Sequence, residues 1–323
     1  MYSQISSNKI RSVALIVLFI FFICLIAYVY GEATGGDGFY LLPFAGVFAF
    51  SSAFVGYFYS DKMVLGISKA KELKHDDNPK IYHLVENLCI AAGLPTPKIY
   101  IIEDTAPNAF ATGRNPNKAV IALTTGIIEK LNKAELEGVI AHELSHIKNY
   151  DMRVMTVAVI FAGIIALLSD WFLRWSIYSK HGSDKGGNQV QALMIVIGLV
   201  LAILSPLIAT LIKLAISRKR EYLADASAAM LTRYPEGLAS ALEKIGADKE
   251  LLEAANKATA HLYIANPLKG KFSSKLFSTH PPIEERVRML RGMIGGGEAS
   301  SGLGPPRRIG TLRLVSSGQA RTP

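Results

Sequence analysis

The stretch Ile140-Ala141-His142-Glu143-Leu144-Ser145-His146-Ile147 decides the fold and the chemistry expected of this chain. Residues four apart on a helix lie on one face, so His142 and His146 can direct imidazole nitrogens at one metal ion. Glu143 is turned off that face and can reach a water at an open coordination position, which is the placement of a general base. The stretch therefore predicts two zinc ligands and a catalytic glutamate.

The flanking residues predict that this stretch lies inside a helix. Asn132 and Glu135 have the spacing of a capping box, and apolar residues then recur at helical intervals. We expect a helix from about Lys133 to about Asn149. A chance match, with two core histidines and one surface glutamate, is the alternative, and the helical context argues against it.

Composition indicates that part of the chain lies in a membrane. Half of the 323 residues are hydrophobic, and the mean hydropathy is positive. One catalytic domain joined to membrane segments fits this better than two soluble domains. The two cysteines, Cys24 and Cys89, indicate neither a disulfide framework nor a sulfur-ligated metal, and they fit a reducing compartment.

The formal net charge of +9 raises the possibility of a nucleic-acid partner. Much of the basic excess follows residue 285, in Arg286, Arg288, Arg291, Arg307, Arg308, Arg313 and Arg321. No recognition helix or aromatic–basic RNA motif accompanies these arginines. Attraction to anionic lipid head groups explains them at least as well, so we expect a lipid bilayer as partner and no nucleic acid.

Four apolar runs are long enough to cross a bilayer, or nearly so. They occupy residues 13–30, 39–59, 154–172 and 190–212. The loop between the first two runs carries no lysine or arginine, whereas Lys62, Lys69 and Lys71 follow the second run. By the positive-inside rule, the N-terminus and everything after residue 61 face the cytoplasm.

The last two runs allow more than one interpretation. The loop between them holds Arg174, Lys180 and Lys185, which fits poorly with an external location. Either the rule is weakly broken here, or the pair forms a hairpin, at about 154–212, that does not fully cross. A buried helical pair in a soluble core is a third interpretation, because Asp170 and Pro206 interrupt the runs.

Short patterns predict a small sheet and several further helices. Residues 98–103, 108–113 and 119–124 predict three strands, the last two joined by a turn at 114–117. Capping signals and apolar spacing predict the helices. They are expected at about 79–92, 217–230, 236–245 and 249–257. After Met293 the chain turns to Gly, Ser, Pro and Arg, which predicts a disordered tail.

A third metal ligand is expected downstream, because a catalytic zinc takes three protein ligands and leaves one position for water. Glu221 and Asp225 lie four residues apart on one helical face, with Arg218 one turn before. Glu221 could ligate the metal, while Asp225 accepts a hydrogen bond from a ligating histidine and Arg218 supports the site from nearby. A solvated charged face is the alternative interpretation.

Four motifs together resemble those of the HtpX-type membrane zinc endopeptidases, relatives of the type I CAAX prenyl proteases. They are His142-Glu143-x-x-His146, Glu221-x-x-x-Asp225, Asn108-Ala-Phe-Ala-Thr-Gly113 and Ser278-Thr279-His280-Pro281-Pro282. The resemblance runs from the first apolar run to about residue 293. It implies a gluzincin-like site with His142, His146 and Glu221 on one zinc ion, Glu143 as the base, a cytoplasmic active site and a role in membrane-protein quality control.

Two further assignments concern the substrate. His280, in a segment made rigid by prolines, is our candidate donor to the tetrahedral oxyanion, and the alternative is a neighbour of a helix N-cap with no catalytic part. Peptide substrates of such enzymes usually lie extended along a sheet edge. The expected edge strand holds Asn108, Ala109, Phe110, Ala111 and Thr112.

The expected architecture is a mainly helical α+β fold in a polytopic membrane protein. About four hydrophobic helices would accompany a gluzincin-like zinc protease domain that carries a small β-sheet. Residues 1–60 would form two transmembrane helices, 61–293 the cytoplasmic protease domain interrupted by the hydrophobic hairpin, and 294–323 a disordered basic tail. The chain would be a multi-pass protein of the cell membrane.

The expected function is zinc-dependent hydrolysis of peptide bonds in misfolded membrane proteins or unfolded proteins, at the cytoplasmic membrane surface. Two alternatives are a catalytically silent, zinc-stabilised membrane scaffold and a basic, membrane-associated nucleic-acid binder. A structural zinc is closed by a fourth ligand and would not need Glu143, so this residue favours the endopeptidase. The nucleic-acid binder has only charge in its favour.

Overall fold

Two long helices at the N-terminus form a hairpin. The computed structural model describes residues 2–33, 36–178, 192, 196–198, 200–201, 218–253, 259, 262–265 and 281–294. In it, α1 (Tyr2–Ala33) is followed by the short 3-10 helix η1 (Gly38–Leu41), then by α2 (Leu42–Phe58) and α3 (Ser60–Ile67). A Cβ on Gly31 would lie 2.6 Å from the Cα of Gly38, so the tight turn of the hairpin depends on glycine.

Within the described ranges, three helices are long and apolar enough to cross a membrane. They cover Ile5–Glu32, Gly38–Phe58 and Asp151–Arg174, the last within α7 (Asp151–Tyr178). Three of the four predicted apolar runs are thus confirmed as long helices. The fourth, at 190–212, lies almost wholly outside the described residues.

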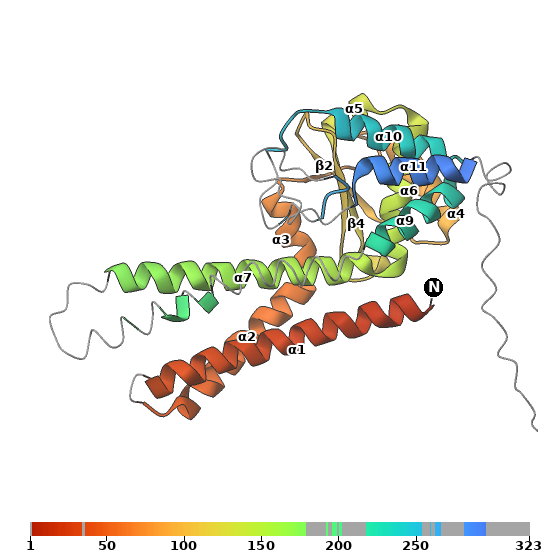
Figure 1. Cartoon of the computed structure of the whole chain (residues 1–323). Coiled ribbons are helices and arrows are strands. Elements are labelled where there is room, and N and C mark those ends of the chain that lie inside the picture. Colours follow the sequence, from red (N-terminus) through yellow and green to blue (C-terminus); the bar gives the residue numbers. More distant parts are fainter. Residues whose placement is uncertain are drawn as a thin grey trace, which may run out of the picture.

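Helix α7 packs along α1 and lies between it and the sheet-bearing part of the molecule (Figure 1). The rings of Phe19 and Phe161 stack, with centroids 4.2 Å apart and planes 9° from parallel. Gly56 of α2 packs against α7, since a Cβ on Gly56 would lie 3.0 Å from the side chain of Ile160. The three apolar helices are therefore one packed unit. The other described residues, within 68–149 and 218–294, carry the sheet and the remaining helices and are called the soluble part below.

The sheet has four strands in the order β1-β2-β4-β3. They are β1 (Lys71–Glu72), β2 (Lys98–Ile102), β3 (Ala109–Thr112) and β4 (Val120–Thr124). β2 and β4 are parallel, with Lys98 opposite Val120, whereas β3 runs antiparallel to β4. The three predicted strands are confirmed. The two-residue β1 was not predicted, because a strand this short shows no period in the sequence.

The remaining helices surround α6 (Lys133–Asn149). They are α4 (Pro79–Ala92), α5 (Thr125–Lys130), α9 (Arg218–Thr232), α10 (Pro235–Ala247) and α11 (Ile283–Ile294). The capping box of Asn132 and Glu135 is present, so the predicted bounds of α6 are confirmed. The structure also confirms a mainly helical α+β architecture with a small sheet.

The predicted helix at 249–257 is wrong where the structure describes it, because residues 249–253 are not helical. The Oδ1 atom of Asp248 accepts a hydrogen bond from the backbone of Glu250, a local side-chain bond that competes with helix formation. Lys130 of α5 then pairs with both carboxylates, at 2.7 and 3.0 Å. Residues 254–257 lie outside the described part.

Helix α6 is buried on nearly every side. Gly138 allows α10 to approach it closely, since a Cβ there would lie 2.7 Å from the backbone nitrogen of Leu238. The main apolar core continues from α6 into α4, α9, α10, α11 and the sheet. The helix that carries the His-Glu-x-x-His stretch is therefore the central helix of the soluble part.

Candidate metal centre

The two histidines of α6 face one another inside the protein. His142 and His146 are 0% and 6% exposed. Their Nε2 atoms lie 3.1 Å apart, as expected for side chains one helical turn apart with both rings turned to the same point. The capping box fixes the start of the helix that carries them.

Glu221 of α9 completes a group of three possible ligands. Its Oε2 atom lies 3.7 Å from His142 Nε2, and its Oε1 atom lies 3.6 Å from His146 Nε2. One ligand atom from each of the three residues lies within 4.8 Å of the other two. The structure therefore brings together all three predicted ligands, from two helices far apart in the sequence.

The chemistry of this donor set fits a divalent metal ion. Tetrahedral ligands at the Zn–N distance of about 2.05 Å would be about 3.3 Å apart, close to the spacings found here. A carboxylate faces each Nδ1, and the two Nε2 atoms are directed at the same point. Three carboxylates, those of Glu221, Glu143 and Asp151, favour a positive charge at this point, and a metal ion would supply that charge.

On the His142 side, the support comes from α9 and α11. Asp225 Oδ1 lies 2.9 Å from His142 Nδ1, and Arg286 holds the same carboxylate through two hydrogen bonds of 2.6 and 2.8 Å. Burial, together with the charge of Arg286, lowers the pKa of His142 to about 4 despite the bond to Asp225. Burial raises the pKa of Asp225, but Arg286 and His142 outweigh it and lower this pKa to about 2.

On the His146 side, the support comes from the candidate membrane helices α7 and α1 and from Arg220 of α9. Asp151, the first residue of α7, has its Oδ2 atom 3.3 Å from His146 Nδ1. Its Oδ1 atom accepts from Asn8 of α1 at 2.7 Å and from Arg220 of α9 at 2.6 Å. Burial disfavours the imidazolium of His146, but the bond to Asp151 and the negative charges around it raise its pKa to about 9. The position therefore favours positive charge.

Glu143 lines a cavity of about 10 Å³ together with both histidines. The other walls are Ala111 of β3, Met152 and Met155 of α7, and Leu262 and Ile264. This volume holds about one water molecule. The base, the ligands and a water-sized space thus meet at one point, while a peptide needs more room than this conformation provides.

The predicted substrate strand lies at the edge of the sheet, but that edge is partly occupied. Residues Asn108, Ala109, Phe110, Ala111 and Thr112 are all buried. The backbone nitrogen of Ile264 donates to the carbonyl of Ala109, and Asn108 donates to the carbonyl of Ala265. The sequence interpretation of an open edge is therefore wrong at Ala109. Backbone groups alternate along a strand, so those of Ala111, like those of Ala109, point away from β4. Ala111 also lines the cavity.

Arg218 does not support the site as the sequence analysis expected. It is exposed at the start of α9, where its charge can be solvated at no cost. Arg220 and Arg286 take the expected role instead, bound to Asp151 and Asp225. His280, the predicted oxyanion donor, lies outside the described residues.

Sequence reasoning also missed Asn8 and the buried role of Arg286. Arg286 was counted with the basic residues expected to attract lipid, yet it is 0% exposed. Its place on an amphipathic stretch, between apolar Ile283 and Val287, was the available signal. Asn8 precedes the first apolar run and lies 143 positions from Asp151, so no local pattern links the two.

Comparisons with known proteins identify the family of this chain. The model of the family described as Peptidase family M48 matches residues 75–294. A "Protease HtpX homolog" from Dictyoglomus turgidum is 48% identical over 298 residues, covering 90% of this chain and 94% of that protein. One from Tropheryma whipplei is 44% identical over 301 residues, covering 91% and 98%.

Among solved structures, the crystal structure of Ste24p from S. mikatae is similar, with 19% identity and a TM-score of 0.49. The match covers 90% of this chain and 67% of that one. The family model spans well over half of this chain, and the relatives match it almost from end to end. The chain therefore belongs to peptidase family M48, as a membrane metalloprotease similar to the HtpX proteins.

Proposed function

We propose that this chain is a zinc endopeptidase that cleaves misfolded membrane proteins and unfolded segments at the cytoplasmic surface of the cell membrane. The observation that carries the proposal is the meeting of His142, His146, Glu221 and Glu143 around one water-sized cavity. Two imidazoles and one carboxylate are a catalytic zinc set. Within the described residues the metal group has three members, which leaves a coordination position open.

The positions of Glu143, Asp225 and Asp151 indicate their roles in hydrolysis. When bound, the metal supplies a Lewis acid that polarises the peptide carbonyl and lowers the pKa of a water to about 7. Glu143 accepts a proton from the attacking water and returns it to the leaving amine. Asp225 and Asp151 hold the two imidazoles at Nδ1, so that each presents Nε2 to the metal.

A substrate peptide would lie along β3. Extended peptides bind by adding hydrogen bonds to a free strand edge. Ala111 faces the cavity and turns its backbone outward, whereas Ala109 is held by Ile264. Binding would therefore displace Leu262 and Ile264 from the edge, or place the peptide next to them. Either movement enlarges the small cavity at the metal.

The position of the site favours cleavage outside the bilayer. The candidate span in α7 begins at Asp151, whose carboxylate lies 3.3 Å from His146 Nδ1, so the span starts beside the metal centre. Lysines follow the second span, whereas the loop before that span carries no lysine or arginine. This distribution favours a cytoplasmic location for the site. A site so close to the surface meets loops and unfolded segments, whereas an intact transmembrane helix has no free backbone to add to a strand.

The decisive experiment compares the wild-type protein with Glu143→Gln in detergent. We expect zinc content to stay the same and casein hydrolysis to fall by roughly 10²–10⁴-fold, because the amide cannot accept the proton. Glu137→Gln, on the same helix and half-buried, is the matched control and should keep full activity. Substantial turnover by Glu143→Gln would show that another group is the base, and a scaffold would show no hydrolysis in any variant.

A second experiment tests the place of cleavage. A membrane-protein substrate is digested, and its new termini are mapped by mass spectrometry. We expect most cuts in cytoplasmic loops or unfolded soluble segments. A majority of cuts inside transmembrane segments would contradict the surface location.

A further inference from the structure

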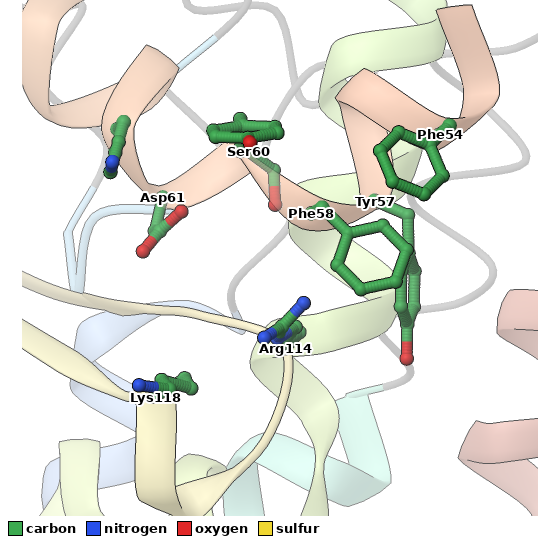
Figure 2. Close-up of a pocket in the computed structure, with 9 residues that line it drawn as sticks. Phe54, Tyr57, Phe58, Ser60, Asp61, Arg114 and Lys118 are labelled. Carbon is green, nitrogen blue, oxygen red and sulfur yellow. The ribbon is translucent and has the colours of Figure 1, made fainter. Parts of the chain in front are cut away.

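A second cavity, of about 280 Å³, lies away from the metal centre, where the end of α2 meets the connection between β3 and β4 (Figure 2). We call it the α2 pocket. Its lining is formed by Phe54, Tyr57, Phe58, Tyr59, Ser60, Asp61, Lys62, Arg114 and Lys118. None of these residues takes part in the proposed hydrolysis.

The α2 pocket lies at one end of a candidate membrane span. The span Gly38–Phe58 ends within the pocket, and the rings of Tyr57, Phe58 and Tyr59 follow one another there. Tyrosine and other aromatic side chains gather where the hydrocarbon of a bilayer meets its head groups. The pocket is therefore placed at head-group depth.

Positive charge dominates the pocket. Lys62, Arg114 and Lys118 line it together with one carboxylate, Asp61. Among the ion pairs formed within the described residues, none includes any of these four side chains. Figure 2 shows Arg114 and Lys118 on the chain between β3 and β4, with Arg114 next to Phe58. The pocket thus offers a net positive charge to a ligand.

Aromatic rings hold two of these cations in place. The Arg114 guanidinium lies 4.6 Å from the ring centroid of Phe58, and the Lys62 ammonium lies 5.4 Å from that of Tyr59. A contact with a ring face positions a cation without neutralising its charge. The N–H groups of Arg114 remain suited to two parallel hydrogen bonds with phosphate oxygens.

An exposed apolar stripe leads from the pocket along α2. Phe50, Phe54 and Phe58 lie at helical spacing and are 66%, 48% and 41% exposed. The rings of Phe54 and Phe58 are 4.4 Å apart. An acyl chain that runs from the pocket into the bilayer would lie along this stripe. Free phosphate has no acyl chain and would make no contact with this stripe.

We propose that the α2 pocket binds the phosphodiester head group of an anionic membrane phospholipid, with an acyl chain along Phe54 and Phe50. The cavity is at the lower end of the size of ligand sites, so it suits a head group and not a whole lipid. Arg114 lies two residues after the end of β3. A bound lipid would therefore tether the edge of the sheet to the membrane surface.

The test is lipid retention by the full-length protein. Nanodiscs contain phosphatidylcholine mixed with phosphatidylglycerol. The protein is extracted from them into detergent, and the phosphatidylglycerol bound per chain is counted by native mass spectrometry. We expect the wild-type protein to retain this lipid and Arg114→Gln/Lys118→Gln to bind it roughly thirtyfold more weakly, because each cation near an anionic surface contributes about fivefold.

The matched control is Lys80→Gln/Lys133→Gln, which removes two charges from exposed positions outside the pocket. It should retain phosphatidylglycerol like the wild-type protein. If Arg114→Gln/Lys118→Gln fails to fold, Lys62→Gln/Lys118→Gln keeps the contact of Arg114 with Phe58 and carries the same expectation. Equal retention by pocket and control variants would overturn the proposal. Displacement of the lipid by an equal concentration of glycerol phosphate or inorganic phosphate would also overturn it.

Discussion

The two histidines of the metal centre are held by different parts of the molecule. His142 is held by Asp225, with Arg286 behind it, from helices of the soluble part. His146 is held by Asp151 at the start of α7, with Asn8 of α1 behind it. The ligands are one turn apart on α6, yet the acceptor for His142 comes from α9, whereas the acceptor for His146 comes from α7 and is held by α1 and by Arg220 of α9.

The difference explains the opposite behaviour of the two imidazoles. Arg286 places a buried positive charge near His142, whose pKa is lowered to about 4, mainly by burial. Around His146, the carboxylates of Asp151, Glu221 and Glu143 outweigh burial and raise the pKa to about 9. The carboxylates around His146 come from α6, α7 and α9 and attract a cation, whereas the surroundings of His142 keep that ligand neutral.

Breaking the soluble side should have the largest effect. Asp225→Ala leaves the guanidinium of Arg286 buried and unpaired, so we expect the free energy of unfolding to fall by about 3–5 kcal/mol. We also expect metal affinity to fall by about 10–100-fold, because His142 loses its orienting acceptor. Chemical denaturation and zinc titration against a chelator measure these two quantities.

The double variant Asp225→Ala/Arg286→Met separates the two effects. It removes the unpaired charge, so stability should recover in large part, while metal affinity should stay low. If the double variant bound zinc like the wild-type protein, Asp225 would act only by neutralising Arg286.

Breaking the membrane side should have a smaller effect on stability. Asp151→Asn keeps the shape of the side chain and weakens its bond to His146, so we expect metal affinity to fall by about 10–100-fold. The partner Arg220 is 13% exposed in its side chain and can still meet water. We therefore expect less loss of stability than for Asp225→Ala, measured by the same denaturation experiment.

Asn8→Ala tests whether α1 contributes to this side. It removes the hydrogen bonds to Asp151 and to the carbonyl of Asn149 while leaving Arg220 in place. Metal affinity should fall by less than in Asp151→Asn. Unchanged affinity would show that α1 anchors the helix without influencing the ligand.

The smallest effect is expected at the start of α6, which supports both sides equally. Glu135 accepts hydrogen bonds from Ser240, Lys244 and the backbone of Asn132. Burial raises its pKa, but these donors outweigh burial and lower it below 4.5. Its contribution to stability is therefore complete above the unfolded pKa of 4.5 and is lost as pH falls through the lower folded value.

Glu135→Gln should reduce stability at neutral pH by roughly 1 kcal/mol and make the acid loss of stability less steep. Thermal unfolding followed over a pH series measures both. Glu137→Gln removes only a 3.8 Å contact with Lys133 and serves as the control. Parallel acid curves for wild type and Glu135→Gln would contradict this account.

Features that depend on neighbours within one or two helical turns were predictable from the amino-acid sequence. The bounds of α6 were predictable because Asn132 and Glu135 cap it locally. The pairing of His142 with His146 was predictable because helical geometry brings residues four apart together. Three strands and three long apolar helices were predictable from their period and length.

The surroundings of the ligands were not predictable, because they depend on contacts between distant segments. Asn8 reaches Asp151 across 143 positions, and Arg286 reaches Asp225 across 61. The tertiary structure also determines that Arg220 and not Arg218 points to the site, and that Ile264 occupies the edge of β3. Hydrophobic and charge periods report spacing along one element, whereas these contacts depend on how separate helices pack and which buried charges must then be neutralised.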